Sequence, residues 1–482
     1  MNKKAPRHKK SPLLPISIIR FHRKTLPFRE KAALFTLLLI MVLSGILSLL
    51  SPLNWIWLIS LLSFSIGLFQ FYSGFIDKPN FLVFESQEIK DLCKFLKPSE
   101  YEEKCGYENT WIPKRNDSII MSQSVNYYLR YNAEKIELKL VLEKASKLLD
   151  SLGNSSIFRD ILVHQYFEAR KHEKKFFNDP KISLLSSITP ETTSIDVFES
   201  CYYLSFLTND LATYDVEDHS HKSQPKNIWL AVEHFPYHNI NHDCDNSSQA
   251  QKGFIAKALG FNINVQSRTK KASQDHEDNQ SVLGRIKDLR GSNMSNHIGG
   301  NTIAFTKDKR MILWRQNESA MRSVGLLAPT GSGSLDFSDY TELSTKNLFA
   351  LAVRGMEREL LEECHPGGSK ISNFIDSTKV VGFYRWVGKA GLPGFLGISK
   401  INAMQSEVIP NSSEVNIPPK LKTDYPAENM EQLKKTIEEL LEKQFKSRSE
   451  KESNLSVPLV ANLLAIKGVI ERDPEFLDFI FK

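Results

Sequence analysis

The sequence predicts a mixed α/β chain in three parts: a two-helix membrane hairpin, an α+β middle region and a C-terminal α/β domain. Two long uncharged runs near the N-terminus predict the hairpin. Short strand patterns around one long amphipathic helix, between residues 302 and 401, predict the α/β domain. The chain has 482 residues, which is enough for two or three domains. We expect a basic cytoplasmic tail at 1–31, two transmembrane helices at 32–76, a middle region of unknown role at 78–290, the α/β domain at 291–410, and a linker with C-terminal helices at 411–482.

The charge and cysteine content exclude several classes of protein. The formal net charge is +6, and much of the surplus lies within residues 3–31. Because the remainder is nearly balanced, we expect no general nucleic-acid binding. The five cysteines form no Cys-x-x-Cys pair and their number is odd, which is typical of a reducing compartment and not of a disulfide framework.

Ala32–Leu50 and Asn54–Ile76 are the two uncharged runs that predict the membrane hairpin. A helix rises about 1.5 Å per residue, so each run can cross a hydrocarbon core of about 30 Å. The basic residues before Ala32 place that side in the cytoplasm, and two spans return the chain to it, so both termini are expected to be cytoplasmic. A signal peptide and a pair of buried core helices are the weaker alternatives.

The middle region contains several segments with periodic apolar residues. Ala133–Leu152, Ile157–Phe177 and Ile195–Leu211 are predicted to be helices, and Asn227–Phe235 a strand. The charged segment Gln266–Asn279 is predicted to be an exposed loop.

One group of residues in this region raises the question of zinc. His234, His238, His242 and Cys244 carry side chains that suit Zn²⁺. Their spacing is not that of a zinc ribbon, and Pro236 interrupts any helix that would align the first two histidines. A polar loop of solvated histidines is the favoured interpretation.

The C-terminal part alternates strand patterns with one helix. Thr302–Phe305 and Met311–Arg315 are expected to be strands that follow one another across a turn. Val324–Ala328 is expected to be a strand that runs into a flexible glycine-rich loop at Pro329–Ser334, and Leu348–Glu363 is predicted to be a helix.

The end of that helix gathers negative charge. Glu359, Glu362 and Glu363 are spaced i, i+3 and i+4, so they lie on one face of the helix. Carboxylates this close repel one another unless they point into water or a cation neutralises them. Mg²⁺ prefers hard oxygen ligands and bridges to phosphates. The face is therefore a candidate Mg²⁺–pyrophosphate site, and the alternative is a solvated acidic face.

Arg358, Glu359, Leu360, Glu362 and Glu363 resemble the second half of the box that marks the Nudix hydrolase family. The strands and glycine-rich loop before the helix, and strand patterns at 379–386 and 394–401 after it, are also similar to that family. The resemblance covers about residues 295–401, and a helix at 459–470 is expected to complete it.

The resemblance implies an α/β/α sandwich that cleaves a nucleoside diphosphate linked to another moiety. It implies that Glu359, Glu362 and Glu363 bind Mg²⁺ (or Mn²⁺), that Arg358 orients them through ion pairs, and that Glu362 or Glu363 assists as general base. Gly331, Gly333 and Arg315 are the candidate contacts to the phosphates of the nucleotide substrate.

The sequence departs from the family pattern at several positions. Ala350 stands where a glutamate is expected, Ser344 where a glycine is expected, and Cys364–Pro366 follows the last glutamate. An insertion of about residues 335–347 separates the loop from the helix. Three acidic residues on this insertion are candidates to replace the missing glutamate: Asp336, Asp339 and Glu342.

Three functional hypotheses follow. The first is a membrane-tethered Nudix-type hydrolase, and the second is a nucleotide-sensing module with weak or no catalysis that signals to the hairpin. In the third, the middle region is a protein-interaction scaffold and the α/β domain is only structural. The sequence leaves the substrate and the oligomeric state open, a homo-oligomer included.

The charged segment Asn429–Lys446 is predicted to be a helix with a solvated face, after a linker at Pro418–Pro426.

Overall fold

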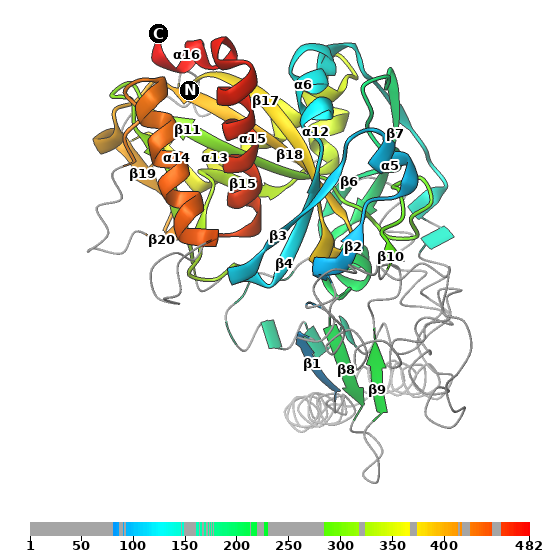
Figure 1. The fold of residues 1–482 in the computed structure, drawn as a ribbon. Coiled ribbons are helices and arrows are strands. Elements are labelled where there is room, and N and C mark those ends of the chain that lie inside the picture. Colours follow the sequence, from blue (N-terminus) through cyan, green and yellow to red (C-terminus); the bar gives the residue numbers. More distant parts are fainter. Residues whose placement is uncertain are drawn as a thin grey trace, which may run out of the picture.

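The computed structural model is a mixed α/β protein built around a seven-stranded sheet (Figure 1). It describes residues 81–85, 90, 93–145, 147–148, parts of 161–176, 178–212, 214–218, 226–229, 284–317, 323–366, 374–412, 415–416, 425–445 and 455–482. The hairpin expected at 32–76 and the residues from His234 to Cys244 lie outside this described part. Within it, no helix has the length and apolar character needed to cross a membrane.

The central sheet is assembled from distant parts of the sequence. Its strands run in the order β12-β11-β18-β17-β4-β3, and β15 pairs with β11 beside β12. Strand β11 is parallel to β18, whereas β17 is antiparallel to both β18 and β4. The bounds are β3 Glu108–Ile112, β4 Asp117–Met121, β11 Gly299–Phe305, β12 Met311–Ile312, β15 Gly331–Ser334, β17 Ile375–Trp386 and β18 Leu392–Ile401.

The same sheet thus contains strands from both sides of residue 290. Met121 on β4 pairs with Tyr384 on β17, and Ile119 pairs with Trp386. The boundary expected at 290 therefore does not separate two sheets, because residues 108–121 extend the sheet formed by 299–401.

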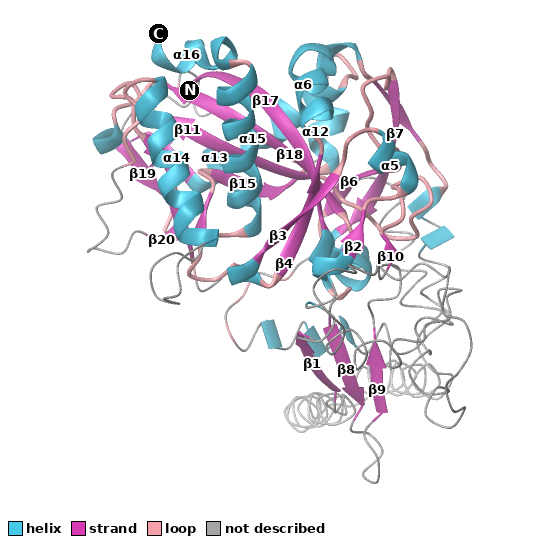
Figure 2. Cartoon of the chain, in the orientation of Figure 1, coloured by secondary structure: helices cyan, strands magenta, loops and turns pink. Residues whose placement is uncertain are grey.

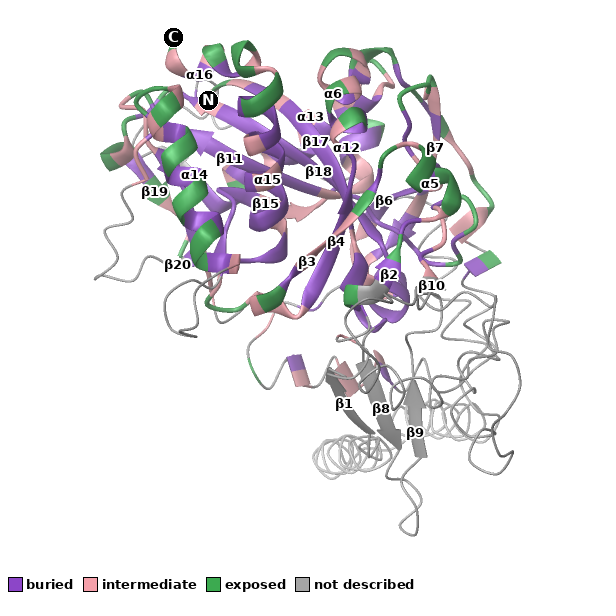
Figure 3. Cartoon of the chain, in the orientation of Figure 1, coloured by how far each residue is buried: buried purple, intermediate pink, exposed green. Residues whose placement is uncertain are grey.

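Helices cover both faces of the central sheet. On one face lie α14 (Met430–Phe445) and α15 (Val457–Arg472), in front of β11 and β18 in Figure 1. Ile303 and Phe305 point toward this face, where they pack in one cluster with residues of both helices. The other face carries α13 (Leu348–Glu363), whose Leu360 packs with Ala304. Alternate residues of a strand point to opposite faces, so β11 contributes to both layers. All of its residues except Gly299 are buried (Figure 3).

A smaller sheet, in the order β5-β7-β6, lies beside the central one (Figure 2). Its strands are β5 Glu137–Leu140, β6 Pro180–Leu184 and β7 Ser194–Cys201. Strand β7 leads into the short helix α9 (Tyr202–Ser205) and a π-helical turn at Phe206–Asp210. The helices expected at 133–152 and 195–211 are therefore wrong in their first halves, where the chain forms β5 and β7 instead.

Other expected elements are confirmed or corrected at residue level. The helix expected at 348–363 has the same bounds in the structure, and the strands expected near 302–305, 379–386 and 394–401 are present in β11, β17 and β18. The prediction of a flexible glycine-rich loop is wrong, because Gly331–Ser334 forms β15. The solvated helix expected at 429–446 is α14, which also buries Leu433, Ile437, Leu440 and Leu441 in the core.

The remaining elements are short. Helices α5 (Glu100–Lys104), α6 (Gln123–Asn132), α12 (Phe337–Thr341) and α16 (Asp478–Phe481) surround the sheets. The minor strands are β1 Phe81–Glu85, β2 Leu96–Lys97, β8 Tyr214–Asp218, β9 Lys226–Trp229, β10 Gly284–Arg285, β13 Trp314–Gln316, β14 Leu327–Ala328, β16 Cys364–Pro366, β19 Val408–Pro410 and β20 Val415–Asn416. The strand expected at 227–235 overlaps β9, and its later residues lie outside the described part.

Candidate functional site

Helix α13 carries the residues that the Nudix resemblance singles out. Its first turn is capped by Asn347, whose Oδ1 accepts a hydrogen bond from the Ala350 backbone N–H at 2.8 Å. A stripe of apolar residues, including Leu351, Met356 and Leu360, anchors the helix on the sheet. The helix ends as Cys364 enters the extended region, so the acidic residues occupy its final turn and a half.

Glycines of β15 let this helix lie directly against the sheet. A Cβ at Gly331 would come within 2.6 Å of the Leu360 backbone nitrogen, and one at Gly333 would overlap the Glu359 carboxylate. Gly331 and Gly333 were expected to line a phosphate-binding loop. In the structure they pair with Thr302 and Gly300 in the sheet and provide space for α13 instead.

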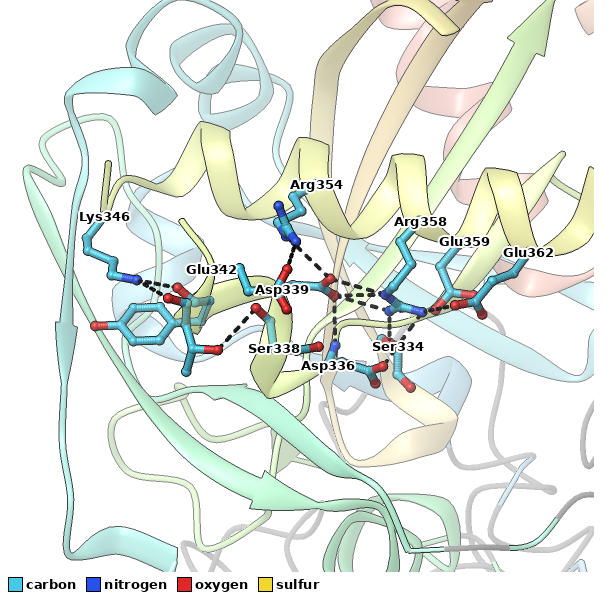
Figure 4. A network of polar contacts seen from close by, with 12 residues as sticks. Ser334, Asp336, Ser338, Asp339, Glu342, Lys346, Arg354, Arg358, Glu359 and Glu362 are labelled. Carbon is cyan, nitrogen blue, oxygen red and sulfur yellow. Dashed lines mark hydrogen bonds and ion pairs between the residues drawn. The ribbon is translucent and has the colours of Figure 1, made fainter. Parts of the chain in front are cut away.

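Arg358 is the centre of an ion-pair network at the end of β15 (Figure 4). Its Nε donates to both Asp339 oxygens at 3.1 and 3.2 Å, and its Nη2 donates to the Ser334 carbonyl at 2.9 Å. Glu359 lies 2.9 Å from Nη2, and Glu362 lies 3.0 Å from Nη1. Burial opposes the charged guanidinium, but the surrounding carboxylates, Glu359 and Asp339 first, raise the pKa of Arg358 well above its ordinary value. Arg358 therefore stays positively charged.

The insertion before α13 supplies the acidic partners that the box itself lacks. Asp339 is buried at the N-terminal turn of α12, where it also accepts a hydrogen bond from the Asp336 backbone N–H at 2.9 Å. Arg354 reaches Asp339 at 4.0 Å and also pairs with Glu342. Asp336 lies 3.8 Å from Arg358. All three acidic residues that the sequence offered as replacements thus lie around the arginines of α13.

The three glutamates that the sequence singled out on α13 (Glu359, Glu362 and Glu363) do not converge as one group. Glu359 and Glu363 are buried, whereas the Glu362 side chain is 54% exposed. In the described part of the chain, no group of three or more His, Cys, Asp and Glu side chains is arranged to hold a metal ion. Burial raises the pKa of Glu359 to about 7, an effect that Arg358 partly offsets.

Arg315, the other expected phosphate contact, lies in a different place. It is on β13, whose neighbours are β14 and β20, and its Nη1 donates to the Gly325 carbonyl at 2.8 Å. The interactions that surround Arg358 do not include it, so the structure does not bring Arg315 together with the glutamates.

Lys181 is a site residue that sequence reasoning missed. It lies on β6 of the smaller sheet, and its Nζ is 2.5 Å from Asp336 Oδ1. Its side chain is 10% exposed, and its charge acts on Glu359. Lys181 comes from the middle region, more than 150 positions before Asp336 in the chain, so no local pattern could have linked the two residues.

The charges and the donor atoms of the network suit a magnesium ion. The ion pairs join three cationic side chains to five acidic ones, which leaves a formal excess of two negative charges: Lys181, Arg354 and Arg358 against Asp336, Asp339, Glu342, Glu359 and Glu362. Carboxylate oxygen is the ligand that Mg²⁺ prefers. Because Mg²⁺ keeps several waters and uses one or two carboxylates together with substrate phosphates, it does not require a preformed group of three glutamates.

Comparison with known proteins adds no relative to this description. A scan against protein-family models found no match to the chain, and a search of curated proteins found none either. The resemblance to the Nudix family therefore rests on the residues of α13 and on the strands around them.

Proposed function

We propose that this protein is a Nudix-type hydrolase that cleaves the pyrophosphate bond of a nucleoside diphosphate derivative with Mg²⁺ (or Mn²⁺). The observation that carries the proposal is the Arg358 network, in which an arginine of the Arg-Glu-x-x-Glu-Glu string is held by a buried aspartate and in turn contacts Glu359 and Glu362. The layered arrangement, with α13 on one face of the sheet and α14 and α15 on the other, is of the kind that the resemblance implies.

The charged residues of the Arg-Glu-x-x-Glu-Glu string each have a part in this proposal. Glu359 and Glu363, both buried, would hold the metal ion, and Arg358 fixes the Glu359 carboxylate in place. When bound, the metal would polarise the phosphoryl oxygens and favour ionisation of a bound water. Glu362 is exposed, and Arg358 contacts its Oε1, so its Oε2 is free of that contact and is the atom proposed to accept a proton from the attacking water.

The test is hydrolysis by the full-length protein. Nucleoside diphosphate sugars, dinucleotides and nucleoside triphosphates would be screened with MgCl₂ and with MnCl₂ by following product release. The double variant Glu359→Gln, Glu363→Gln is expected to abolish metal-dependent turnover, because removing two carboxylates removes the metal ligands. Glu471→Gln on α15, where Glu471 pairs with Lys467 at the surface, is the matched control. Unchanged hydrolysis in the double variant would contradict the assigned site.

A second candidate is a nucleotide-sensing module without turnover. Two observations favour it. Arg358 already forms ion pairs with Glu359 and Glu362, and the described residues contain no preformed group of three carboxylates. Nucleotide binding by calorimetry, with no hydrolysis in Mg²⁺ or Mn²⁺, would support the sensor over the enzyme. Turnover that depends on Glu359 would exclude it.

The membrane hairpin at 32–76 belongs to the same proposal, with both termini in the cytoplasm. Protease treatment of sealed membrane vesicles tests this orientation, because a cytoplasmic C-terminal region is digested from the cytoplasmic side alone. Protection of that region from protease on the cytoplasmic side would contradict it.

A further inference from the structure

We propose that Lys181 and Ser183 form an anion-binding subsite that takes a phosphate group beside the Arg358 network. The choice of a substrate phosphate as the natural ligand rests on the proposed function. The subsite itself rests on the geometry of β6, a strand of the middle region whose role the sequence left unknown.

Strand alternation places the relevant side chains on one face. Lys181 and Ser183 are two residues apart on β6, so both point to the same side of the smaller sheet. Lys181 stands opposite Asp336 and Ser183 stands opposite His297, each through an antiparallel bridge. Residues directly opposite in such a pair share a face. Lys181, Ser183, Asp336 and His297 therefore line one polar strip, which is bordered on its β7 side by Ser200 and Phe198.

Two groups in this strip can still donate hydrogen bonds. The Lys181 ammonium has three N–H donors, and Asp336 Oδ1 takes one of them at 2.5 Å. Ser183 is fully buried, and its Oγ has no hydrogen-bond partner among the described residues. A buried hydroxyl without a partner is costly, so such a group calls for an explanation. A phosphate oxygen would accept hydrogen bonds from both side chains.

Lys181 supplies positive charge to the strip, and Lys389 also acts on the His297 ring. The Lys181 charge acts on Glu359 on one side and on His297 on the other. The His297 ring is buried and its Nδ1 is hydrogen-bonded to Ser205 Oγ. Burial lowers the pKa of His297 to about 3, so the ring is neutral and adds no positive charge.

The ion pair with Asp336 leaves the Lys181 ammonium able to turn toward another anion. The Asp336 carboxylate also faces Arg358, at 3.8 Å from Nη1, so one carboxylate lies between two cations. If Lys181 turns toward an incoming anion, Asp336 keeps a positively charged neighbour. A lysine, with a flexible stem and a compact charge, can make this small movement at low cost.

The experiment measures binding of inorganic pyrophosphate to the full-length protein in MgCl₂ by calorimetry. Lys181→Met is expected to weaken binding by about tenfold or more, since a charged hydrogen bond contributes enough for that factor. Lys181→Arg keeps the charge and is expected to remain within about threefold of the wild type. Ser183→Ala is expected to weaken binding by a smaller factor. Lys400→Met, which removes a lysine paired with Asp376 at the sheet, is the control and should leave binding unchanged.

Folding of the variants is controlled by the double variant Lys181→Met, Asp336→Asn, which removes both charges of the pair together. It should melt near the wild-type temperature and still bind pyrophosphate weakly. Wild-type affinity in Lys181→Met or in the double variant Lys181→Met, Asp336→Asn would overturn the subsite, and so would no pyrophosphate binding by the wild type.

Hydrolysis separates the subsite from the proposed function. Where turnover occurs, the subsite requires Lys181→Met to raise KM more than it lowers kcat. Turnover whose KM does not change in Lys181→Met would overturn the subsite while the hydrolase proposal stands. Pyrophosphate binding that depends on Lys181, without any turnover, would support the subsite and contradict the hydrolase proposal.

Discussion

Arg385 and Arg358 are two arginines of the same fold in opposite situations. Arg385, on β17, is 1% exposed, and its Nη1 lies 2.7 and 2.9 Å from the two oxygens of the equally buried Glu102. Its Nε donates to the Gly391 carbonyl at 3.0 Å. Arg358 is 22% exposed, and the carboxylates around it come from two helices and the turn before one of them: Asp336, Asp339, Glu359 and Glu362.

The difference separates a structural ion pair from the site that we propose accepts a cation. The Arg385–Glu102 pair is balanced in charge and closed to solvent, so it holds α5 against the central sheet. The Arg358 network has more negative than positive charge and remains accessible to water at Glu362. The two arginines thus differ in the charge balance around them, and the proposed cation site rests on that difference.

Breaking the balanced pair should have the largest effect on stability. Arg385→Met is expected to lower the free energy of unfolding by about 3–5 kcal/mol, because it leaves Glu102 buried without its cation. Urea denaturation followed by fluorescence measures this. The double variant Arg385→Met, Glu102→Met should recover much of the loss. If Arg385→Met unfolds at the same urea concentration as the wild type, the Arg385–Glu102 pair does not stabilise the fold as expected.

Mg²⁺ should act on the unbalanced network alone. At about one hundred times its dissociation constant, a ligand that binds only the folded state stabilises it by about 2.7 kcal/mol. We expect MgCl₂ to raise the urea midpoint of the wild type, and Glu359→Gln to lose this increase. Arg385→Met, although less stable, should show the same increase as the wild type. An increase that persists in Glu359→Gln would place the ion elsewhere.

Acid should also change the stability of the region around the Arg358 network, through His297 beside Lys181. Burial lowers the pKa of His297 from 6.5 to about 3. Between these values the unfolded chain binds a proton that the folded state does not, so stability falls as pH falls. The loss should reach about 2 kcal/mol at pH 5. Comparison of urea midpoints at pH 5 and pH 8 should show a smaller difference in His297→Gln than in the wild type. Equal differences would mean that His297 is not held neutral.

The smallest effect is expected at the edge of the network. Arg354 and Glu342 form an ion pair in which the side chains are 40% and 52% exposed. Exposed pairs contribute about 0–1 kcal/mol, so Glu342→Gln should change the free energy of unfolding by about 0.5 kcal/mol or less. A loss several times larger in thermal or urea unfolding would show that the network behaves as one cooperative unit.

The part of the fold that could be predicted is the part whose local signals agree. In α13, the cap at Asn347 and the apolar stripe from Leu348 to Leu360 indicate one helix, and its bounds were predicted correctly. In β11, a run of apolar and small residues bounded by turns predicts a buried strand. These signals need no knowledge of distant residues.

The wrong predictions come from segments in which a two-residue period was taken for a helical one. Glu137 and Lys139 are exposed while Leu138 between them is buried, which is the alternation of a strand. β7 has an imperfect version of the same alternation, with Ile195 and Val197 buried and Ser194 and Asp196 only partly so. The glycines of β15 were taken for a loop because their packing against α13 depends on a helix that comes later in the chain.

The candidate site was predicted in its composition but not in its arrangement. The spacing of Glu359, Glu362 and Glu363 identifies the helix face but not that Glu362 alone is exposed. Asp339 was among the candidates for the missing acid, and its contact with Arg358 required the three-dimensional structure. Lys181 carried no signal, because its partner Asp336 is brought to it by the pairing of β6 with a distant segment.

The pairing of β4 with β17 has a consequence for biosynthesis. Met121 meets Tyr384 only after more than 260 intervening residues have left the ribosome. Such a high contact order slows folding, and until then β4 presents an open edge of unpaired backbone groups. We therefore expect a nascent chain that depends on chaperones, and a fragment that begins at residue 290 to aggregate through the bare edge of β17.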